Sequence, residues 1–147
     1  MNYNNKSEIL KRANFLLKDG VKNRESIFHT PIISSFSRQN ISSRVMVLRA
    51  HNATQRTMRF HSDFRSDKVK ELLDDPRTSI IGYDPALKTQ IRLVGKSKIH
   101  HNNKNSLKAW DESQAISKKC YSVKDGSSHK AKKPEIYDFH MKDIKLE

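Results

Sequence analysis

The sequence predicts a mainly β domain with flanking helices (α+β), whose strands form a small antiparallel barrel. Several short stretches rich in β-branched residues follow one another, and polar turns containing Asp, Asn, Gly or Pro separate them. Apolar residues recur at helical spacing near the beginning of the chain and again after residue 104. With 147 residues, 35% of them hydrophobic, the chain is long enough for a single core.

The first periodic segment predicts a helix from Ser7 to about Lys18. Ser7 is a suitable N-terminal cap, and Gly20 is expected to stop the helix. The apolar residues that recur at steps of three and four are Ile9, Leu10, Ala13, Leu16 and Leu17. This pattern is typical of a helix that packs on a core and has no chemical role.

The strands follow this helix, and two of them are expected to pair. Residues 44–49 and 57–62 flank a polar turn at 51–54, which predicts a hairpin. Residues 37–43 are expected to form a loop, and Gly95 to mark a bulge or a close approach of the backbone. The predicted strands are 26–36, 44–49, 57–62, 77–83 and 89–99.

The rest of the chain completes one predicted domain over residues 1–147. His100 and His101 are adjacent and would point to opposite faces of a strand, so a polar loop is favoured over a metal site. A helix is expected from Lys104 to near Tyr121. The predicted parts are a helical lead at 1–22, barrel and helices at 23–123, a basic loop at 124–133 and a last strand at 134–147.

The charge indicates an anionic partner. The 29 Lys and Arg residues against 16 Asp and Glu residues give +13, which suits nucleic acid, a membrane surface or a phosphorylated small molecule. Aromatic residues make up only 7% and are not interleaved with basic runs, which argues against nucleic acid. The single cysteine, Cys120, suits a reducing compartment, and no apolar run has the length of a membrane span. We therefore expect a cytoplasmic protein that binds no membrane.

One stretch, residues 44–68, carries the candidate site. Arg65, Ser66 and Lys68 are expected in the first turn of a helix, where backbone N–H groups, a hydroxyl and two cations would suit a phosphate monoester. An ordinary exposed helix start with the same residues is the competing interpretation.

Several segments in a fixed order resemble the flavin-binding split-barrel family typified by pyridoxamine 5′-phosphate oxidase. The resemblance runs from about Ile27 to Gly95 and more loosely to Trp110 and beyond. Several motifs at matching separations are more specific than any one of them. The matching segments are 44–49 (RVMVLR), 60–68 (FHSDFRSDK), Asp75-Pro76 and 90–95 (QIRLVG).

The resemblance implies an FMN-binding homodimer with the flavin at the interface. It assigns the phosphate to Arg44, Arg65, Ser66 and Lys68, and it assigns substrate contact to Arg49 as well. His61 would contact the ring, but no neighbour orients it as a general base, and the catalytic residues are unknown. The implied cofactor-binding residues are Arg44, Val45, Met46, Val47, Leu48, Arg49, His61, Ser62, Arg65, Ser66, Lys68 and Gln90.

The activity implied is that of an FMN-dependent oxidoreductase with an unknown small-molecule substrate. Arg49 replaces a substrate-binding lysine of the parent enzyme, Asp67 replaces a basic phosphate contact, and residues 107–117 lack its substrate-binding array. The chain stops at Glu147, so we expect either a short or C-terminally truncated member or a member whose missing contacts come from another subunit. The alternatives are a flavin or haem binder without catalysis and a basic nucleic-acid-binding domain.

Overall fold

The computed structural model describes residues 5–38, 40–122 and 126. The chain forms two compact units, of which the first comprises Met1–His61 and Asp75–Ser97, and the second Ser62–Asp74 and Lys98–Glu147. The predicted last strand at 134–147 lies outside the described residues, as does all of the predicted basic loop at 124–133 except Gly126.

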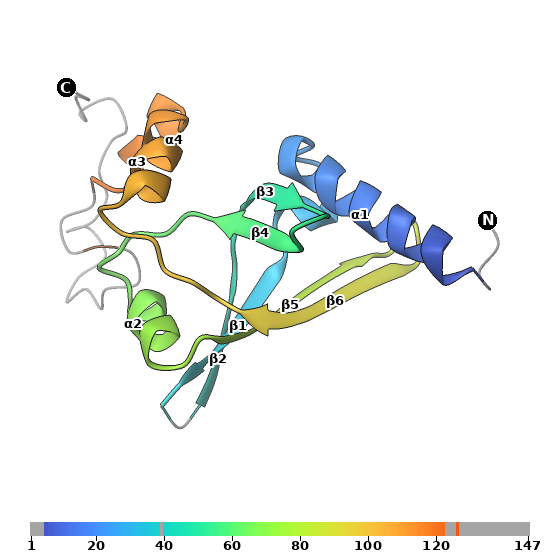
Figure 1. Cartoon of the computed structure of the whole chain (residues 1–147), viewed down its shortest axis with the longest axis horizontal. Helices are drawn as coiled ribbons and strands as arrows, with labels where there is room; N and C mark the ends of the chain where they lie inside the picture. Colours follow the sequence, from blue (N-terminus) through green and yellow to red (C-terminus); the bar gives the residue numbers. More distant parts are fainter. Residues whose placement is uncertain (1–4, 39, 123–125, 127–147) are drawn as a thin grey trace. The chain divides into compact units, whose positions relative to one another are not determined.

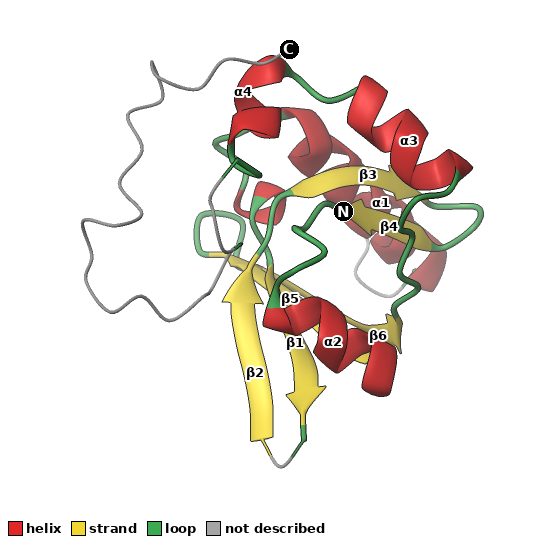
Figure 2. Ribbon diagram, turned by 90° about the vertical axis from the view of Figure 1, so that its left-hand side faces the viewer, coloured by secondary structure: helices red, strands yellow, loops and turns green. Residues whose placement is uncertain are grey.

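The first unit contains two antiparallel sheets (Figures 1 and 2). The four-stranded sheet has the order β2-β1-β5-β6, and the two-stranded sheet pairs β3 with β4. The β1–β2 hairpin extends beyond β5, because β1 pairs with β2 up to Ser37 but with β5 only up to Ser35. The strands are β1 (Ile32–Ser37), β2 (Asn40–Val45), β3 (Leu48–Asn52), β4 (Thr57–Phe60), β5 (Arg77–Asp84) and β6 (Thr89–Lys96).

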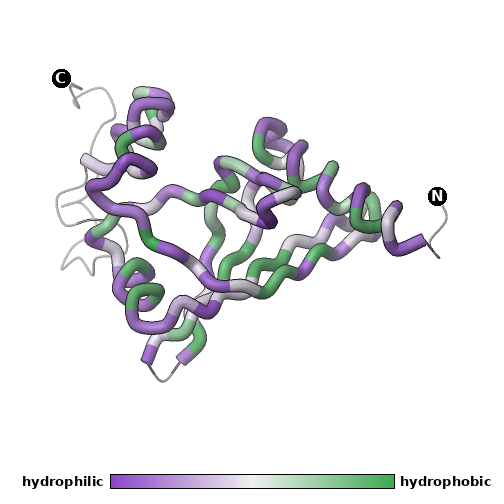
Figure 3. The backbone as a smooth tube through the Cα atoms, in the orientation of Figure 1, coloured by the Kyte–Doolittle hydropathy of each residue, from purple (hydrophilic) through white to green (hydrophobic). Residues whose placement is uncertain are grey.

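The core of this unit is built around Phe28, which lies in the short 3-10 helix η1 (Ile27–His29) and is 1% exposed. The helix α1 (Lys6–Lys22) contributes Leu16 and Leu17 to the same cluster, and β6 contributes Ile91. Figure 3 shows how apolar residues recur along α1 and gather in the middle of β5. Burial of these side chains is the main force that holds α1 on the sheets.

Two glycines allow the close packing around Phe28. A Cβ atom on Gly20 of α1 would lie 2.7 Å from the carbonyl carbon of Phe28, and one on Gly82 of β5 would lie 2.9 Å from its ring. The helix also continues past Gly20, whose carbonyl accepts a 2.6 Å hydrogen bond from Nδ1 of His29. The prediction that Gly20 stops the helix was therefore wrong, because the residue serves close packing instead.

Other predicted boundaries also shift. Asn5 caps α1 through hydrogen bonds to Ser7 and Glu8, so Ser7 lies inside the helix. The predicted strand 26–36 is interrupted by η1, and the predicted loop 37–43 contains most of β2. Gly95 pairs regularly with Thr78 and has no atom near its missing Cβ, so the expected bulge is absent there.

The second unit contains three described helices: α2 (Asp67–Asp74), α3 (Lys104–Asp111) and α4 (Ala115–Lys119). Asn103 and Ser106 form a reciprocal capping box at the start of α3. The predicted helix after Lys104 is thus present but divided into two pieces. His101 stacks on Phe64 with ring centroids 3.6 Å apart, whereas His100 contacts Asn103 and Asn105. The two histidines contact different residues, and both lie in a loop, as the sequence predicted.

Antiparallel sheets with flanking helices confirm the predicted α+β class. Within the described part of the chain, no helix is both long enough and apolar enough to cross a membrane.

Candidate functional site

The predicted site residues are divided between the two units. The first unit contains residues 44–49, His61 and Gln90, and the second contains Ser62, Arg65, Ser66 and Lys68. Each group is built by its own local structure.

The segment 44–49 is not one strand. It is broken at Met46 and Val47, so that Arg44 ends up in β2 of the larger sheet while Arg49 lies in β3 of the smaller one. Met46 donates its backbone N–H to the carbonyl of Pro31 at 3.2 Å. Of the predicted strand 44–49, only Leu48 and Arg49 belong to the hairpin with β4, because the chain changes sheets at the break. The strand β3 continues to Asn52 and so includes the first half of the predicted turn at 51–54.

Arg44 is half-buried and its guanidinium is fixed by hydroxyl groups. Nη1 donates to Oγ of Ser35 at 2.5 Å, and Nη2 donates to Oγ of Ser42 at 2.7 Å. Ser35 is almost fully buried. Both of these acceptors are neutral hydroxyl groups, and they fix the orientation of the guanidinium.

Arg49 lies at a β-bulge. Leu48 pairs with Phe60 and Ala50 pairs with Arg59, so Arg49 is the extra residue between two pairs. Leu48 is fully buried, whereas Arg49 is exposed. A bulge bends its strand and re-aims the side chain of the extra residue. This arrangement presents the Arg49 guanidinium to solvent beside the break at Met46 and Val47.

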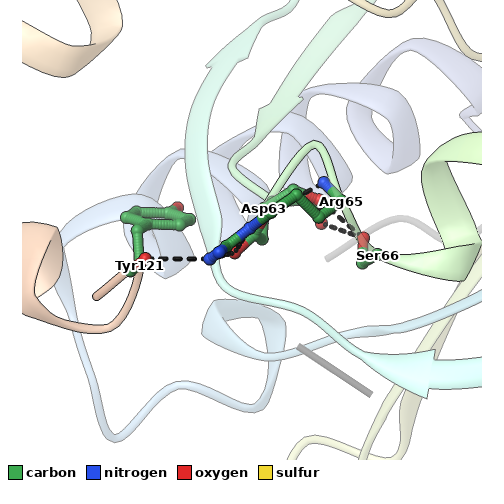
Figure 4. A network of polar contacts seen from close by, with 5 residues as sticks. Asp63, Arg65, Ser66 and Tyr121 are labelled. Atoms are coloured by element: carbon green, nitrogen blue, oxygen red, sulfur yellow. Dashed lines mark hydrogen bonds and ion pairs between the residues drawn. The ribbon is translucent and has the colours of Figure 1, made fainter. Parts of the chain in front are cut away.

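The turn from Ser62 to Ser66 is braced by hydrogen bonds to Asp63 (Figure 4). The carbonyl of Asp63 accepts from the backbone N–H of Ser66 at 3.1 Å and from its hydroxyl at 2.7 Å. The hydroxyls of Ser62 and Ser66 lie 3.1 Å apart. Ser66 is therefore almost completely buried at the entrance to α2.

Arg65 is held side-on by the Asp63 carboxylate. Nε donates to Oδ1 at 2.9 Å and Nη2 to Oδ2 at 2.6 Å, while Nη2 also donates to the carbonyl of Tyr121 at 3.0 Å (Figure 4). The hydrogen bond from Arg65 lowers the pKa of Asp63 below its usual value despite burial, and the charge of Lys68 contributes in the same direction. Asp63 is thus ionised beside both cations.

The helix α2 begins at Asp67, so Lys68 lies in its first turn, whereas Arg65 and Ser66 precede it. The prediction placed all three inside the helix; the Asp63 turn delays the helix start by its own hydrogen bonds. The hydroxyls, the helix N-terminus and the cations still form a donor set that fits a phosphate monoester.

His61 and Gln90 complete the predicted set. His61 follows the end of β4 and is half-buried. Gln90 pairs with Tyr83 in the β5–β6 ladder and is exposed.

Sequence reasoning missed Asp63 and Ser35 because it searched for groups that bind an anion and not for the groups that orient them. The Asp-x-Arg spacing at 63–65 was the available signal.

Comparison with known proteins gives three findings. A family model described as "Pyridoxamine 5′-phosphate oxidase, FMN-binding domain" matches residues 14–101. No curated protein matches the chain. The structure is similar to a pyridoxamine 5′-phosphate oxidase-related, FMN-binding protein from Nostoc punctiforme, with a TM-score of 0.67 and 16% identity over 86% of this chain and 69% of that one.

A second similar structure is PhzG from Burkholderia lata, solved in complex with tetrahydrophenazine-1-carboxylic acid. The TM-score is 0.67 and the identity 21% over 88% of this chain, which spans only 62% of that protein.

Proposed function

This chain belongs to the pyridoxamine 5′-phosphate oxidase family of FMN-binding domains, and we propose that it is an FMN-dependent oxidoreductase acting on a small anionic substrate. FMN is the cofactor of the family. The observation that carries the proposal is the match over residues 14–101, which includes every predicted flavin-binding residue. We assign the whole chain to a single domain of this family.

The residues present fit FMN. Lys68, Ser66 and Arg65 would hold the phosphate through charge-assisted and hydroxyl hydrogen bonds at the start of α2, and Arg44 would add a further cation. The backbone of Val45 to Arg49, with His61, Ser62 and Gln90, would position the isoalloxazine ring and ribityl chain. Bound FMN supplies the hydride chemistry, and the protein supplies position and hydrogen bonds.

Arg49 is the residue we assign to the substrate. Its exposed guanidinium on the bulge of β3 would bind a carboxylate or phosphate group of the substrate. A guanidinium binds such groups in a bidentate geometry that the lysine of the parent enzyme cannot copy, so the preferred substrate would differ from pyridoxamine 5′-phosphate.

We also propose a homodimer with FMN at the interface. Ile32 pairs with Val45 and Phe36 pairs with Ile41, so these four side chains share one face of the β1–β2 hairpin, and all four are exposed. An apolar sheet face of this kind is typical of a protein interface. A reducing cytoplasm would suit the exposed free thiol of Cys120.

The test is spectroscopic. The purified protein is titrated with FMN and with riboflavin, and binding is followed through the flavin band near ~450 nm. We expect FMN to bind, and Lys68→Ala to weaken FMN several-fold while leaving riboflavin affinity nearly unchanged. Lys70→Ala is the matched control, because Lys70 lies on the same helix but is exposed and paired with Asp67.

Two outcomes would contradict the proposal. A protein that neither perturbs the FMN spectrum nor gains thermal stability from FMN would not be a flavoprotein. A holoprotein whose flavin is not reduced by any amine, alcohol or nicotinamide donor under anaerobic conditions would support the alternative of a flavin carrier without catalysis.

A further inference from the structure

The pair formed by Asp63 and Arg65 occurs a second time in the chain, at Asp75 and Arg77. In both, the backbone N–H of the arginine donates to Oδ1 of the aspartate, at 2.9 Å and 3.0 Å respectively. In both, Nη2 donates to Oδ2 at 2.6 Å, and Nε donates to both oxygens. The binding of the guanidinium by the carboxylate through Nε and Nη2 is therefore a local property of the Asp-x-Arg turn, and it does not depend on a ligand.

The two copies differ in their surroundings. The side chain of Asp63 is 8% exposed, compared with 27% for Asp75. Arg65 also donates to the carbonyl of Tyr121, and Gly126 lies against its side chain, with φ at +84°. The first copy precedes the N-terminus of α2, whose first turn carries Lys68, whereas the second copy follows the C-terminal end of that helix. The first copy is thus the one placed at the phosphate-binding turn.

A carboxylate that binds a guanidinium side-on uses the same hydrogen-bond geometry as a phosphate. Asp63 therefore occupies the Nε and Nη2 donors of Arg65, which a phosphate would otherwise bind. It also places a negative charge beside Lys68, whose proximity is reflected in the lowered pKa of Asp63. A phosphate carrying about two negative charges would be repelled by this ionised carboxylate.

Two effects oppose each other. Asp63 fixes Arg65 and so reduces the conformational entropy that phosphate binding would otherwise lose. It also cancels one of the two positive charges that Arg65 and Lys68 bring to the turn. The hydrogen bond from Arg65 to the carbonyl of Tyr121 does not involve Asp63, so part of the orientation of Arg65 should survive the removal of the carboxylate charge, whereas the repulsion should disappear completely. The electrostatic effect should therefore be the larger.

We propose that Asp63 is an internal counter-anion that competes with the cofactor phosphate for Arg65 and so lowers the selectivity of the site for FMN over riboflavin. The inference rests on the proposed function, since it assumes that Arg65 contacts the phosphate. It assigns Asp63 a role in setting cofactor affinity, as a residue that acts on the phosphate through Arg65.

The experiment compares FMN and riboflavin affinities in the wild-type protein, Asp63→Asn and Asp75→Asn. Asparagine keeps the Oδ1 acceptor for the backbone N–H of residue 65, and it removes the charge together with the Oδ2 acceptor of Nη2. A nearby charge changes the equilibrium constant for binding an ion or proton by about one to three powers of ten. Because Arg65 is half-exposed, solvent and salt screen the charge of Asp63, and the effect should lie near the lower value. We expect Asp63→Asn to bind FMN about tenfold more tightly, with riboflavin unchanged.

Asp75→Asn removes an identical pair outside the site, so both affinities should equal those of the wild type. Unchanged or weaker FMN binding in Asp63→Asn would overturn the proposal, as would a parallel change in riboflavin affinity, which would indicate a structural role. Wild-type protein and Asp63→Asn that both bind FMN no better than riboflavin would overturn it too. If wild-type protein binds neither flavin, the proposed function itself fails, and this result is distinct from the others.

Discussion

Replacing Gly20 by alanine tests whether close packing on Phe28 holds the first unit together. The new Cβ would lie 2.7 Å from the carbonyl carbon of Phe28, 2.8 Å from its carbonyl oxygen and 3.0 Å from its Cβ. Two of these atoms belong to the backbone, so relief requires a shift of η1 or of the last turns of α1. The hydrogen bond from His29 to the Gly20 carbonyl lies at the same contact.

The change in the free energy of unfolding caused by Gly20→Ala has two opposing contributions. Alanine is favoured over glycine inside a helix by about 1 kcal/mol. Overpacking costs about 1–3 kcal/mol, and a clash with backbone belongs at the upper end. The free energy of unfolding should therefore fall by about 1–2 kcal/mol, which lowers the melting temperature by about 3–6 °C for a chain of this size.

The chain offers matched glycine controls. At Gly82 the nearest atoms belong to the Phe28 ring, at 2.9 Å and 3.1 Å, and a ring can move more easily than backbone. At Gly95 no atom lies within 4 Å of the added Cβ. In urea unfolding followed by circular dichroism, we expect Gly95→Ala to have the highest free energy of unfolding of the three variants, Gly82→Ala an intermediate value and Gly20→Ala the lowest. Gly20→Ala that is as stable as Gly95→Ala would refute the packing argument.

Two further predictions concern the first unit. Burial lowers the pKa of His51 below its ordinary value of 6.5, so the unfolded chain takes up a proton that the folded chain does not, and stability should fall as pH decreases through 6.5 toward the folded pKa. His51→Gln should flatten that dependence in urea midpoints measured from pH 7.5 to 5. Ile41→Lys with Val45→Lys should convert the dimer into monomers in sedimentation experiments, while Leu87→Lys should not, and a wild-type holoprotein that sediments as a monomer would contradict the interface.

The sequence was sufficient for the class of fold, since this depends on local patterns and ordered motifs, whereas the residues of the candidate site stay a prediction. It placed β5, β6 and both helical regions within a few residues. It missed β2, because the polar run SRQNISS has the composition of a loop and becomes a strand only through pairing with β1. It also missed the break at Met46 and Val47, since a continuous β-branched run contains no sign of a change between sheets.

At the candidate site too, the sequence could not predict contacts that depend on the folded structure. The motif predicted that Arg65 and Lys68 are cations that bind a phosphate. It could not show that Asp63 closes on Arg65 or that Ser35 and Ser42 hold Arg44, because these contacts depend on a turn and on a cross-strand register.

The bulge at Arg49 has a consequence for how such a protein can diversify. The extra residue has no cross-strand partner, whereas Leu48 and Ala50 on either side keep theirs. Cross-strand pairs are the main source of stability in a hairpin. A replacement at position 49 therefore leaves those pairs intact, so that mutation and selection can exchange this exposed side chain for another while the hairpin that carries it remains the same.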